Sequence, residues 1–481
     1  MNPSRVLLFL LLCLGSIAAV AFLFPKSGLK ISKDKTVSFV DINSFLTPKI
    51  DSSKINQEKQ LEEKKSLQER KQDILKKTTR TLVDTLVLLQ VAATESNARF
   101  YYSSSDYSMM DKFFDALEKV KADNTSFRII HYGDSQIEMD RISSNLREKL
   151  QKRYGGGGPG LLPALEVTPK YTVGQEATGI WKRKLTFGSN EWRASHNRYG
   201  PMAYFCKKES DPASIIIAAR DNSTFKNKQF KTCKVLVGAL DRPLDISVAT
   251  AGKTIGNKTI LASPIEQIVE FEMDSTNGKV GIKFTGANAD ILGISLDDHT
   301  GISVDNIPMR GCSGTIFKRI NSETLRRTYQ MLGVKALILQ FGGNALPGMK
   351  SKSSADAYGK KFYDELMYLK SIDPNLILFV IGPADMSVRE GGVLKTHSQL
   401  ENVRDALKQA TINAGGIFWD MYEAMGGNGS MIDWVKQKPS LGSPDYIHFT
   451  QKGASKISEI FYESLMKEYE MYQLKRKVNS K

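Results

Sequence analysis

A serine stands where a strand-like segment ends and a helix-like pattern begins. The apolar run that starts at Ile129 ends in Gly133, Asp134 and Ser135. Apolar side chains then recur with helical spacing, at Ile137, Ile142, Leu146 and Leu150. Because backbone N–H groups at the start of a helix stabilise negative charge, this turn suits a serine nucleophile with an oxyanion developing beside it.

A histidine that could activate this serine lies far along the chain. His448 follows Asp445 within one turn's length of sequence. An imidazole can take the proton of a serine hydroxyl, and a nearby carboxylate can hold the ring in the required tautomer. We therefore predict that Ser135, Asp445 and His448 form a catalytic triad. A surface capping pair is the alternative interpretation of Asp445 and His448, and Asp385 and Asp420 compete as the partner of the histidine.

Two further segments offer hydrogen-bond donors to an oxyanion. The apolar run over residues 337–344 ends in two glycines and Asn344, whose side-chain amide can donate. Gly314 can donate its backbone N–H, because glycine lets the main chain approach closely. With the N–H of Ser135 itself, these groups form the predicted oxyanion hole. An ordinary turn is the alternative interpretation of each glycine taken alone.

In chain order, these motifs resemble the SGNH, or GDSL-type, hydrolase superfamily. Its four name-giving residues match Ser135, Gly314, Asn344 and His448, and its triad acid matches Asp445. Gln136 stands where the superfamily usually has leucine, and Ala345 stands where it usually has aspartate. Neither difference removes a catalytic group.

A closer resemblance is to bacterial peptidoglycan O-acetylesterases and their O-acetyltransferase relatives. It rests on residues 147–160, 418–422 and 425–434, and it extends over roughly residues 125–470. The resemblance implies an α/β protein with the three-layer, flavodoxin-like SGNH-hydrolase fold around a parallel sheet. It also implies a serine mechanism without a cofactor.

The pattern of the later part of the chain agrees with such a fold. Strand-like and helix-like segments alternate over residues 336–341, 355–371, 376–381, 399–414, 416–419 and 452–470. Alternation of this kind predicts a mostly parallel sheet with helices on both faces. Ser135, Gly314 and Asn344 then fall at the carboxyl ends of strands, where sites form in such sheets.

Residues 166–300 have a different character, with short strands and frequent turn residues. We expect an inserted β-sandwich here, of a type that often binds carbohydrate, between two parts of the hydrolase domain at residues 81–165 and 301–475. Aromatic residues gather near its start, at Trp181, Trp192, Tyr199 and Tyr204. Core packing is the default expectation for these rings, and sugar stacking is the alternative.

The first residues suggest a membrane segment. Val6 to Phe24 are all apolar or small, which is close to the length of a bilayer-spanning helix. Residues 1–25 are therefore expected to be a transmembrane anchor, with a cleaved export signal as the alternative because residues 19–21 read Ala-Val-Ala. Residues 26–80 are expected to form a tether and a charged helical stalk, and residues 81–93 to pack on the domain. Lysines after the span outnumber Arg5 before it, so charge does not favour the expected orientation, with the catalytic domain outside.

The composition of the chain limits the classes of molecule and metal that it is expected to bind. The formal net charge is +15, yet no nucleic-acid-binding motif accompanies it, so we expect a lysine-rich solvated surface and no nucleic acid partner. The histidines are scattered without metal spacing, and no metal is expected. Cys206 and Cys233 could pair if the chain is exported, whereas Cys312 is expected to be a buried small hydrophobe.

The sequence thus predicts an exported, membrane-tethered serine esterase in the periplasm or outside the cytoplasm. Its expected substrate is an acetylated polysaccharide of the cell envelope, first of all peptidoglycan. One alternative is an O-acetyltransferase that uses the same triad beside a membrane-bound O-acyltransferase. A second is a non-catalytic protein that binds the cell wall.

Overall fold

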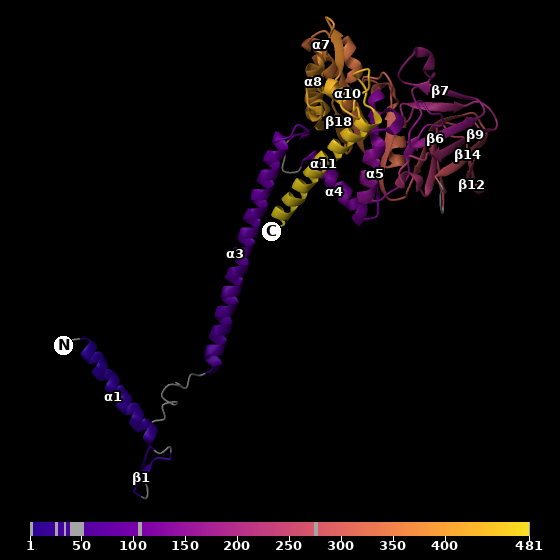
Figure 1. Cartoon of the computed structure of the whole chain (residues 1–481). Coiled ribbons are helices and arrows are strands. Elements are labelled where there is room, and N and C mark those ends of the chain that lie inside the picture. Colours follow the sequence, from indigo (N-terminus) through magenta and orange to yellow (C-terminus); the bar gives the residue numbers. More distant parts are fainter. Residues whose placement is uncertain are drawn as a thin grey trace. The chain divides into compact units, whose positions relative to one another are not determined.

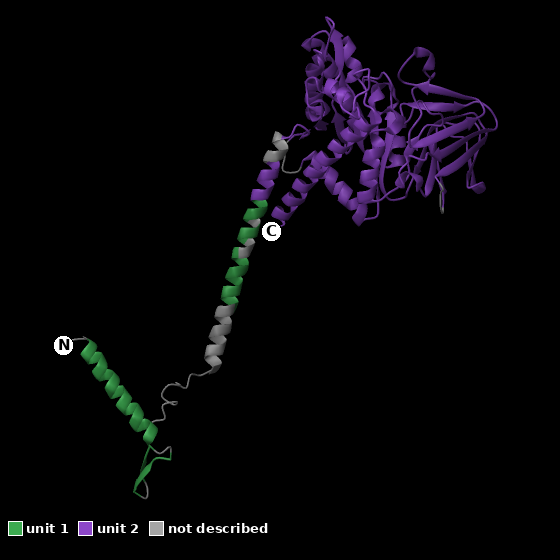
Figure 2. Cartoon of the chain, in the orientation of Figure 1, with its two compact units in different colours: residues 1–83 green, residues 84–481 purple. Residues whose placement is uncertain are grey.

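The structure is a computed structural model that describes residues 3–24, 27–32, 35–38, 52–103, 108–273 and 278–480. It divides into two compact units, residues 1–83 and 84–481 (Figure 2). Part of the expected tether, residues 39–51, lies outside the described residues. The elements of the first unit are α1 (Pro3–Leu23), β1 (Leu29–Ser32), β2 (Lys35–Val37) and most of α3 (Ser52–Glu95).

Helix α1 is the apolar segment noted in the sequence. Within it, Ser4–Leu23 has a mean hydropathy of 2.9 and is long and apolar enough to cross a bilayer, a property that export signals share. The expected stalk and the segment at residues 81–93 form one continuous helix, α3 (Figure 1). Val87 and Leu88 on α3 are 50% and 70% exposed. That residues 81–93 pack on the domain stays a prediction.

The central sheet positions the predicted site. In the described part of the chain its order is β16 (Gly301–Pro308), β4 (Ser126–Gly133), β17 (Val334–Gln340), β18 (Ile377–Ile381), β21 (Ile417–Trp419) and β3 (Phe100–Tyr101). All neighbouring pairs are parallel except β21 and the edge strand β3. The α/β class with a mostly parallel sheet, expected from the sequence, is confirmed.

Helices cover the two faces of this sheet (Figure 1). One hydrophobic cluster receives Ile130 and Tyr132 from β4, and the other receives Phe127 and Ile129, as the alternation of side chains along a strand requires. The first cluster includes side chains of α6 (Ser322–Leu332), α7 (Lys352–Ile372) and α8 (Leu400–Asn413). The second includes side chains of α4 (Met109–Ala122), α5 (Ser143–Tyr154), α9 (Met421–Met425), α10 (Ser430–Lys436) and α11 (Gln451–Asn479).

Between α5 and β16 the chain forms two antiparallel sheets. The first has the order β13 (Gln267–Glu272), β10 (Thr232–Val237), β15 (Ala289–Asp297), β8 (Tyr204–Lys208) and β7 (Trp181–Leu185), with β5 (Gly160–Leu162) also on β15. The second has the order β12 (Lys253–Ile260), β11 (Leu244–Thr250), β14 (Lys279–Gly286), β9 (Ala213–Ala219) and β6 (Val173–Thr178). One hydrophobic cluster joins side chains from both sheets, such as Val235 and Ile246. Because β5 already pairs with β15, this part of the fold begins before the expected boundary at residue 166.

Short elements complete the fold around the sheet edge. They are the hairpin β19 (Ser387–Glu390) and β20 (Val393–Thr396) and the 3₁₀ turns η1 (Ser135–Asp140), η2 (Asn190–Trp192), η3 (Lys226–Lys228), η4 (Phe317–Arg319) and η5 (Gly343–Gly348). Two of these turns, η1 and η5, directly follow strands of the central sheet.

The cysteine pair considered from the sequence is not joined. Cys206 and Cys233 are buried free thiols on β8 and β10. Strand β15 lies between these strands, with Cys206 opposite Ile291 and Cys233 opposite Leu296. Two sheet spacings exceed the Cα separation that a disulfide can bridge, so this pairing would require the sheet to be rebuilt.

Candidate active site

The register of the central sheet brings three separate loops to one edge. Gly133, the last residue of β4, lies opposite Pro308 of β16 on one side and opposite Gln340 of β17 on the other. The segments after these strands carry Ser135, Gly314 and Asn344. Parallel strands end at the same edge, so the sheet itself collects residues that are far apart in sequence.

Ser135 is the first residue of η1, and Asp134 fixes this turn. The Asp134 carboxylate accepts a hydrogen bond of 2.9 Å from the backbone N–H of Gln136, which is the usual role of a helix-capping aspartate. Burial raises the pKa of Asp134 to about 6, against the opposing effect of the Gln136 N–H.

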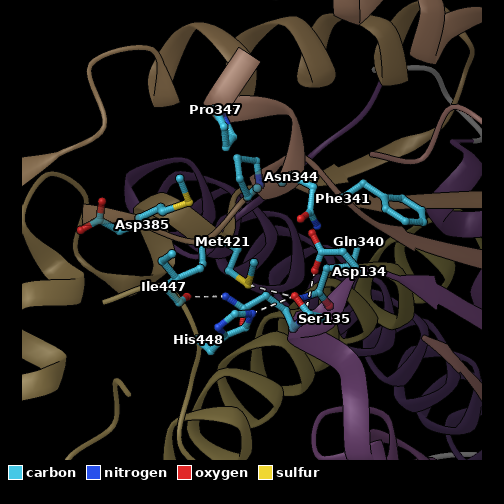
Figure 3. Close-up of a pocket in the computed structure, with 16 residues that line it drawn as sticks. Asp134, Ser135, Gln340, Phe341, Asn344, Pro347, Asp385, Met421, Ile447 and His448 are labelled. Carbon is cyan, nitrogen blue, oxygen red and sulfur yellow. Dashed lines mark hydrogen bonds between the residues drawn. The ribbon is translucent and has the colours of Figure 1, made fainter. Parts of the chain in front are cut away.

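Ser135, His448 and Asp445 lie in one hydrogen-bonded row (Figure 3 shows the first two). Ser135 Oγ is 2.8 Å from His448 Nε2, and His448 Nδ1 is 2.7 Å from Asp445 Oδ2. With the ring proton on Nδ1, the imidazole donates to the carboxylate and Nε2 accepts from the serine hydroxyl. The structure therefore brings together the three residues that the sequence predicts as a triad.

Asp445 is held as an anion that faces the histidine ring. Its Oδ1 accepts hydrogen bonds from the backbone N–H groups of Ile447, at 2.9 Å, and His448, at 3.0 Å. Partial burial acts to raise the pKa of Asp445, but the hydrogen bonds from the ring and backbone of His448 and from Ile447 outweigh it and lower the pKa.

The two competing carboxylates serve other contacts. Asp385 accepts hydrogen bonds from Thr396 Oγ1 and from the backbone N–H of Met431, both at 2.8 Å. Asp420 caps α9 by accepting from the N–H of Glu423. Among the described residues, Asp445 is the one whose carboxylate is hydrogen-bonded to the His448 ring.

The predicted oxyanion donors are placed differently from one another. Asn344 lines the pocket beside Ser135, and its Nδ2 donates weakly to the backbone oxygen of Cys312, at 3.4 Å. Gly314 is buried and is not among the pocket-lining residues. Its N–H donates to Cys312 Sγ at 3.3 Å. In this arrangement both donors are engaged with Cys312, the Asn344 amide with its backbone oxygen and the Gly314 N–H with its sulfur.

The pocket is a cavity of about 160 Å³ over the carboxyl ends of β4, β17 and β18. Its lining includes the predicted residues Ser135, Asn344 and His448. The apolar part of the lining includes Pro347, Met421 and Ile447 (Figure 3), together with Pro383, Ala384 and Met386. A small apolar cavity over a serine–histidine pair can hold the short acyl group of an ester.

Two residues to which the sequence assigned no role in the site connect the nucleophile to the histidine loop. Gln136 Nε2 donates to Ile447 O at 2.6 Å, and Gln136 Oε1 accepts from the Phe449 N–H at 3.4 Å. Arg141 donates to Ser135 O at 2.8 Å and to Phe449 O at 2.9 Å. The departure of Gln136 from the leucine usual in the superfamily was the one sequence signal for this connection.

A third connection reaches the loop that carries Gly314. Arg310 Nε and Nη2 each lie 2.6 Å from a carboxylate oxygen of Glu138. Such a two-point contact fixes orientation as well as distance. The turn after Ser135 is thus joined to the loops on both sides of it.

Comparisons with known proteins give a match at the level of structure. Neither protein-family models nor curated proteins match the sequence. A solved peptidoglycan O-acetylesterase is 18% identical, with a TM-score of 0.60 over 76% of this chain and 98% of that chain. This likeness shows a shared fold, and it confirms for the fold the resemblance drawn from the motifs.

Other solved structures are more distant. A family two carbohydrate esterase from Clostridium thermocellum is 9% identical, with a TM-score of 0.24 over 56% of this chain and 95% of that chain. A GDSL-like lipase from Parabacteroides merdae is 16% identical, with a TM-score of 0.25 over 34% of this chain and 74% of that chain. At these TM-scores neither structure adds to the argument.

Proposed function

We propose that this chain is a serine esterase that removes O-acetyl groups from a polysaccharide of the cell envelope, first of all peptidoglycan. The observation that carries the proposal is the row formed by Ser135 Oγ, the His448 ring and the Asp445 carboxylate. The fold shared with a peptidoglycan O-acetylesterase supports the choice of substrate.

In the first half of the reaction, Ser135 Oγ attacks the carbonyl carbon of the acetyl ester while His448 Nε2 takes the hydroxyl proton. The charge that forms on His448 is stabilised by Asp445, which already accepts from Nδ1. The carbonyl oxygen becomes an oxyanion, and when it collapses the sugar oxygen leaves with the proton from Nε2. Ser135 then carries the acetyl group.

In the second half, His448 takes a proton from water, and the water oxygen attacks the acetyl carbon. Collapse of this second intermediate releases acetate and returns the proton to Ser135 Oγ. The oxyanion donors are the N–H of Ser135, the amide of Asn344 and the N–H of Gly314. Loss of one such donor typically raises the barrier by about 3–4 kcal/mol. The Gly314 N–H would have to leave Cys312 Sγ before it could donate to the oxyanion.

The rest of the chain suits an enzyme of the cell envelope. In this proposal α1 is the membrane anchor or export signal, residues 26–80 are the tether and stalk, and residues 81–165 and 301–475 are the hydrolase domain. The antiparallel sheets, which begin with β5 before residue 166, are the inserted β-sandwich, and the catalytic domain lies outside the cytoplasm.

Acetate release from O-acetylated peptidoglycan and from p-nitrophenyl acetate tests the proposal. Ser135→Ala should lower both rates by roughly a thousandfold or more while the circular dichroism spectrum stays unchanged. Unchanged turnover would remove Ser135 from the mechanism. Acetylated sugar formed from an added oligosaccharide, in place of acetate, would identify a transferase with the same triad.

A further inference from the structure

A second, smaller cavity adjoins the catalytic pocket from the side of the sheet that carries α5 and α11. This rear cavity has a volume of about 10 Å³ and shares two lining residues with the pocket, Gln340 and Met421. Most of its other lining side chains are apolar and belong to the second hydrophobic cluster. They are Ile142, Leu146, Ile381, Trp419, Ile457 and Phe461. The proposed mechanism uses none of these side chains.

The rear cavity is suited to an apolar group. Besides Gln340, its lining includes the polar side chains of His131 and Ser458, and both are already hydrogen-bonded. Ser458 Oγ donates to Ile142 O at 3.1 Å, and His131 uses both ring nitrogens. A cavity of this size has room for roughly one water molecule, which would need two or more polar partners to be held there. Carbon atoms fit this lining better than water does.

Gln340 and Met421 form the partition between the two cavities, because each side chain lines both of them. Gln340 is the last residue of β17, Met421 is the first residue of α9, and both are almost fully buried. Gln340 Nε2 lies 3.8 Å from Met421 Sδ, so the two side chains meet. Figure 3 shows both among the side chains that line the catalytic pocket.

A row of buried hydrogen bonds fixes the Gln340 side of this partition. Asn306 Nδ2 donates to Ser143 Oγ at 2.9 Å, so the Ser143 hydroxyl donates in turn to His131 Nδ1, also at 2.9 Å. His131 Nε2 then carries the ring proton and donates to Gln340 Oε1 at 3.1 Å. Burial lowers the pKa of His131 to about 4, against the opposing effect of this last bond, so the ring is neutral at neutral pH. The Gln340 amide nitrogen is thereby directed at Met421.

The two members of the partition differ in how they are held. Turning Gln340 aside would leave the buried N–H of His131 without an acceptor, which is costly. Met421 is held mainly by packing, and its unbranched thioether chain fills the space that remains. Truncation of Met421 would therefore join the two cavities while Gln340 stays in place.

We propose that Gln340 and Met421 determine the length of the acyl group that the catalytic pocket accepts. The inference rests on the proposed esterase function and names the residues that restrict it to a short acyl group. The methyl group of an acetyl ester ends before the partition, whereas the further carbons of a longer acyl chain meet the Met421 side chain and the fixed Gln340 amide. Without Met421, those carbons would enter the rear cavity.

Hydrolysis of p-nitrophenyl acetate, butyrate and hexanoate by the full chain in detergent micelles tests the proposal. In the wild type, kcat/KM for butyrate should be at least tenfold below that for acetate, because the extra carbons do not fit. In Met421→Ala the ratio of butyrate to acetate should rise by roughly tenfold, since burial of two further methylene groups is worth about that factor. Met421→Val should give an intermediate ratio, and it tests the same point if Met421→Ala does not fold.

Two further variants separate the partition from a general effect on packing. Adding Ile457→Phe to Met421→Ala fills the rear cavity from α11, and it should return the ratio to within about threefold of wild type. Met431→Ala removes another fully buried methionine, on α10, which lines neither cavity. This control should keep the wild-type ratio.

The inference is overturned if the wild type hydrolyses butyrate as well as acetate, or if the Met421 variants hydrolyse acetate with the wild-type ratio. It is also overturned if Met431→Ala raises the ratio equally, or if Ile457→Phe does not reverse the rise. These results would leave the esterase function intact. A wild-type chain that hydrolyses none of the three esters would instead overturn the esterase function, and this inference with it.

Discussion

The side-chain amide of Gln136 bridges the nucleophile turn and the histidine loop, with Nε2 2.6 Å from Ile447 O. Its oxygen accepts from the Phe449 N–H, so one side chain holds the backbone on both sides of His448. The Ser135–His448 distance depends on how this loop sits, because its backbone carries the imidazole. Gln136 is therefore a positioning residue for the general base.

Replacing Gln136 by leucine, the residue usual at this position in the superfamily, should lower kcat by about tenfold to a hundredfold. A base displaced by a fraction of an ångström transfers protons less efficiently, while substrate binding is little affected. KM should therefore stay within about twofold, and steady-state kinetics with p-nitrophenyl acetate would measure both constants.

Gln409→Leu is the matched control, because Gln409 is exposed on α8 and bonds to Asn413 on the same helix. It should leave kcat unchanged. Gln136 would not be a positioning residue if the kcat of Gln136→Leu equalled that of the control. The same holds if kcat and the melting temperature of Gln136→Leu fell together in proportion.

The loop that carries Gly314 can be tested with two alanine substitutions. Gly314 and Gly311 have φ values of +79° and +75°. A Cβ at Gly314 would lie 2.8–2.9 Å from the rings of Phe341 and Phe362, whereas a Cβ at Gly311 would meet nothing within 4 Å. Gly311→Ala should destabilise the fold by about 1–2 kcal/mol, from the left-handed backbone alone. Gly314→Ala should cost a further ~1–3 kcal/mol from overpacking.

Urea unfolding of the two variants would measure this difference. Equal destabilisation would mean that the packing around Gly314 is looser than the structure shows. Activity per folded molecule in Gly314→Ala would then report on whether this loop supplies an oxyanion donor.

Much of the site could be predicted because each part rests on a local pattern. The apolar run before Ser135 and the one before Asn344 are strands, and parallel strands end at a common edge, so adjacent loops follow from the pattern alone. His448 could be assigned to the same site because the motifs follow one another along the chain in the order that is typical of the superfamily. The bridge from Gln136 to Ile447 could not be foreseen, since it depends on side-chain contacts between segments that are distant in sequence.

The end of a helix is a second feature that the sequence pattern alone does not predict, because it also depends on contacts with distant segments. The pattern predicts a last helix ending at Glu470, but α11 continues to Asn479. Tyr469 and Tyr472 pack their rings on Phe114 of α4, at centroid distances of 5.2 and 5.5 Å. This contact buries Tyr472, just beyond the predicted end of the helix, and periodicity within α11 gives no information about its partner helix.

Removal of residues 1–26 tests the proposed role of α1. The shortened chain should move from the membrane fraction to the soluble fraction, because the anchoring apolar helix is gone. Its kcat should equal that of the full chain, since the pocket residues lie between Asp134 and His448. Alkaline extraction of membranes followed by immunoblotting would measure the distribution. If the complete chain is expressed and the purified protein has a mass that lacks these residues, the segment is instead a cleaved export signal.

A buried carboxyl group far from the pocket should make stability depend on pH. Glu468 on α11 accepts a hydrogen bond of 2.7 Å from Tyr102 Oη. Burial raises its pKa from the usual 4.5 to about 7, although the Tyr102 hydrogen bond and Lys475 act in the opposite direction. At a pH between 4.5 and about 7, the unfolded chain releases the carboxyl proton of Glu468 more readily than the folded chain does. The contribution of Glu468 is therefore fully present below pH 4.5 and is lost as the pH rises through about 7.

Glu468→Gln cannot ionise and keeps an oxygen that can accept from Tyr102. Relative to wild type, the variant should gain roughly 3 kcal/mol of unfolding free energy between pH 4.5 and pH 8. Urea unfolding at the two pH values would measure this change, with Glu463→Gln, an exposed glutamate on the same helix, as the control. Esterase turnover should be unaffected in both variants. A stability difference that is the same at both pH values would mean that Glu468 ionises normally in the folded protein.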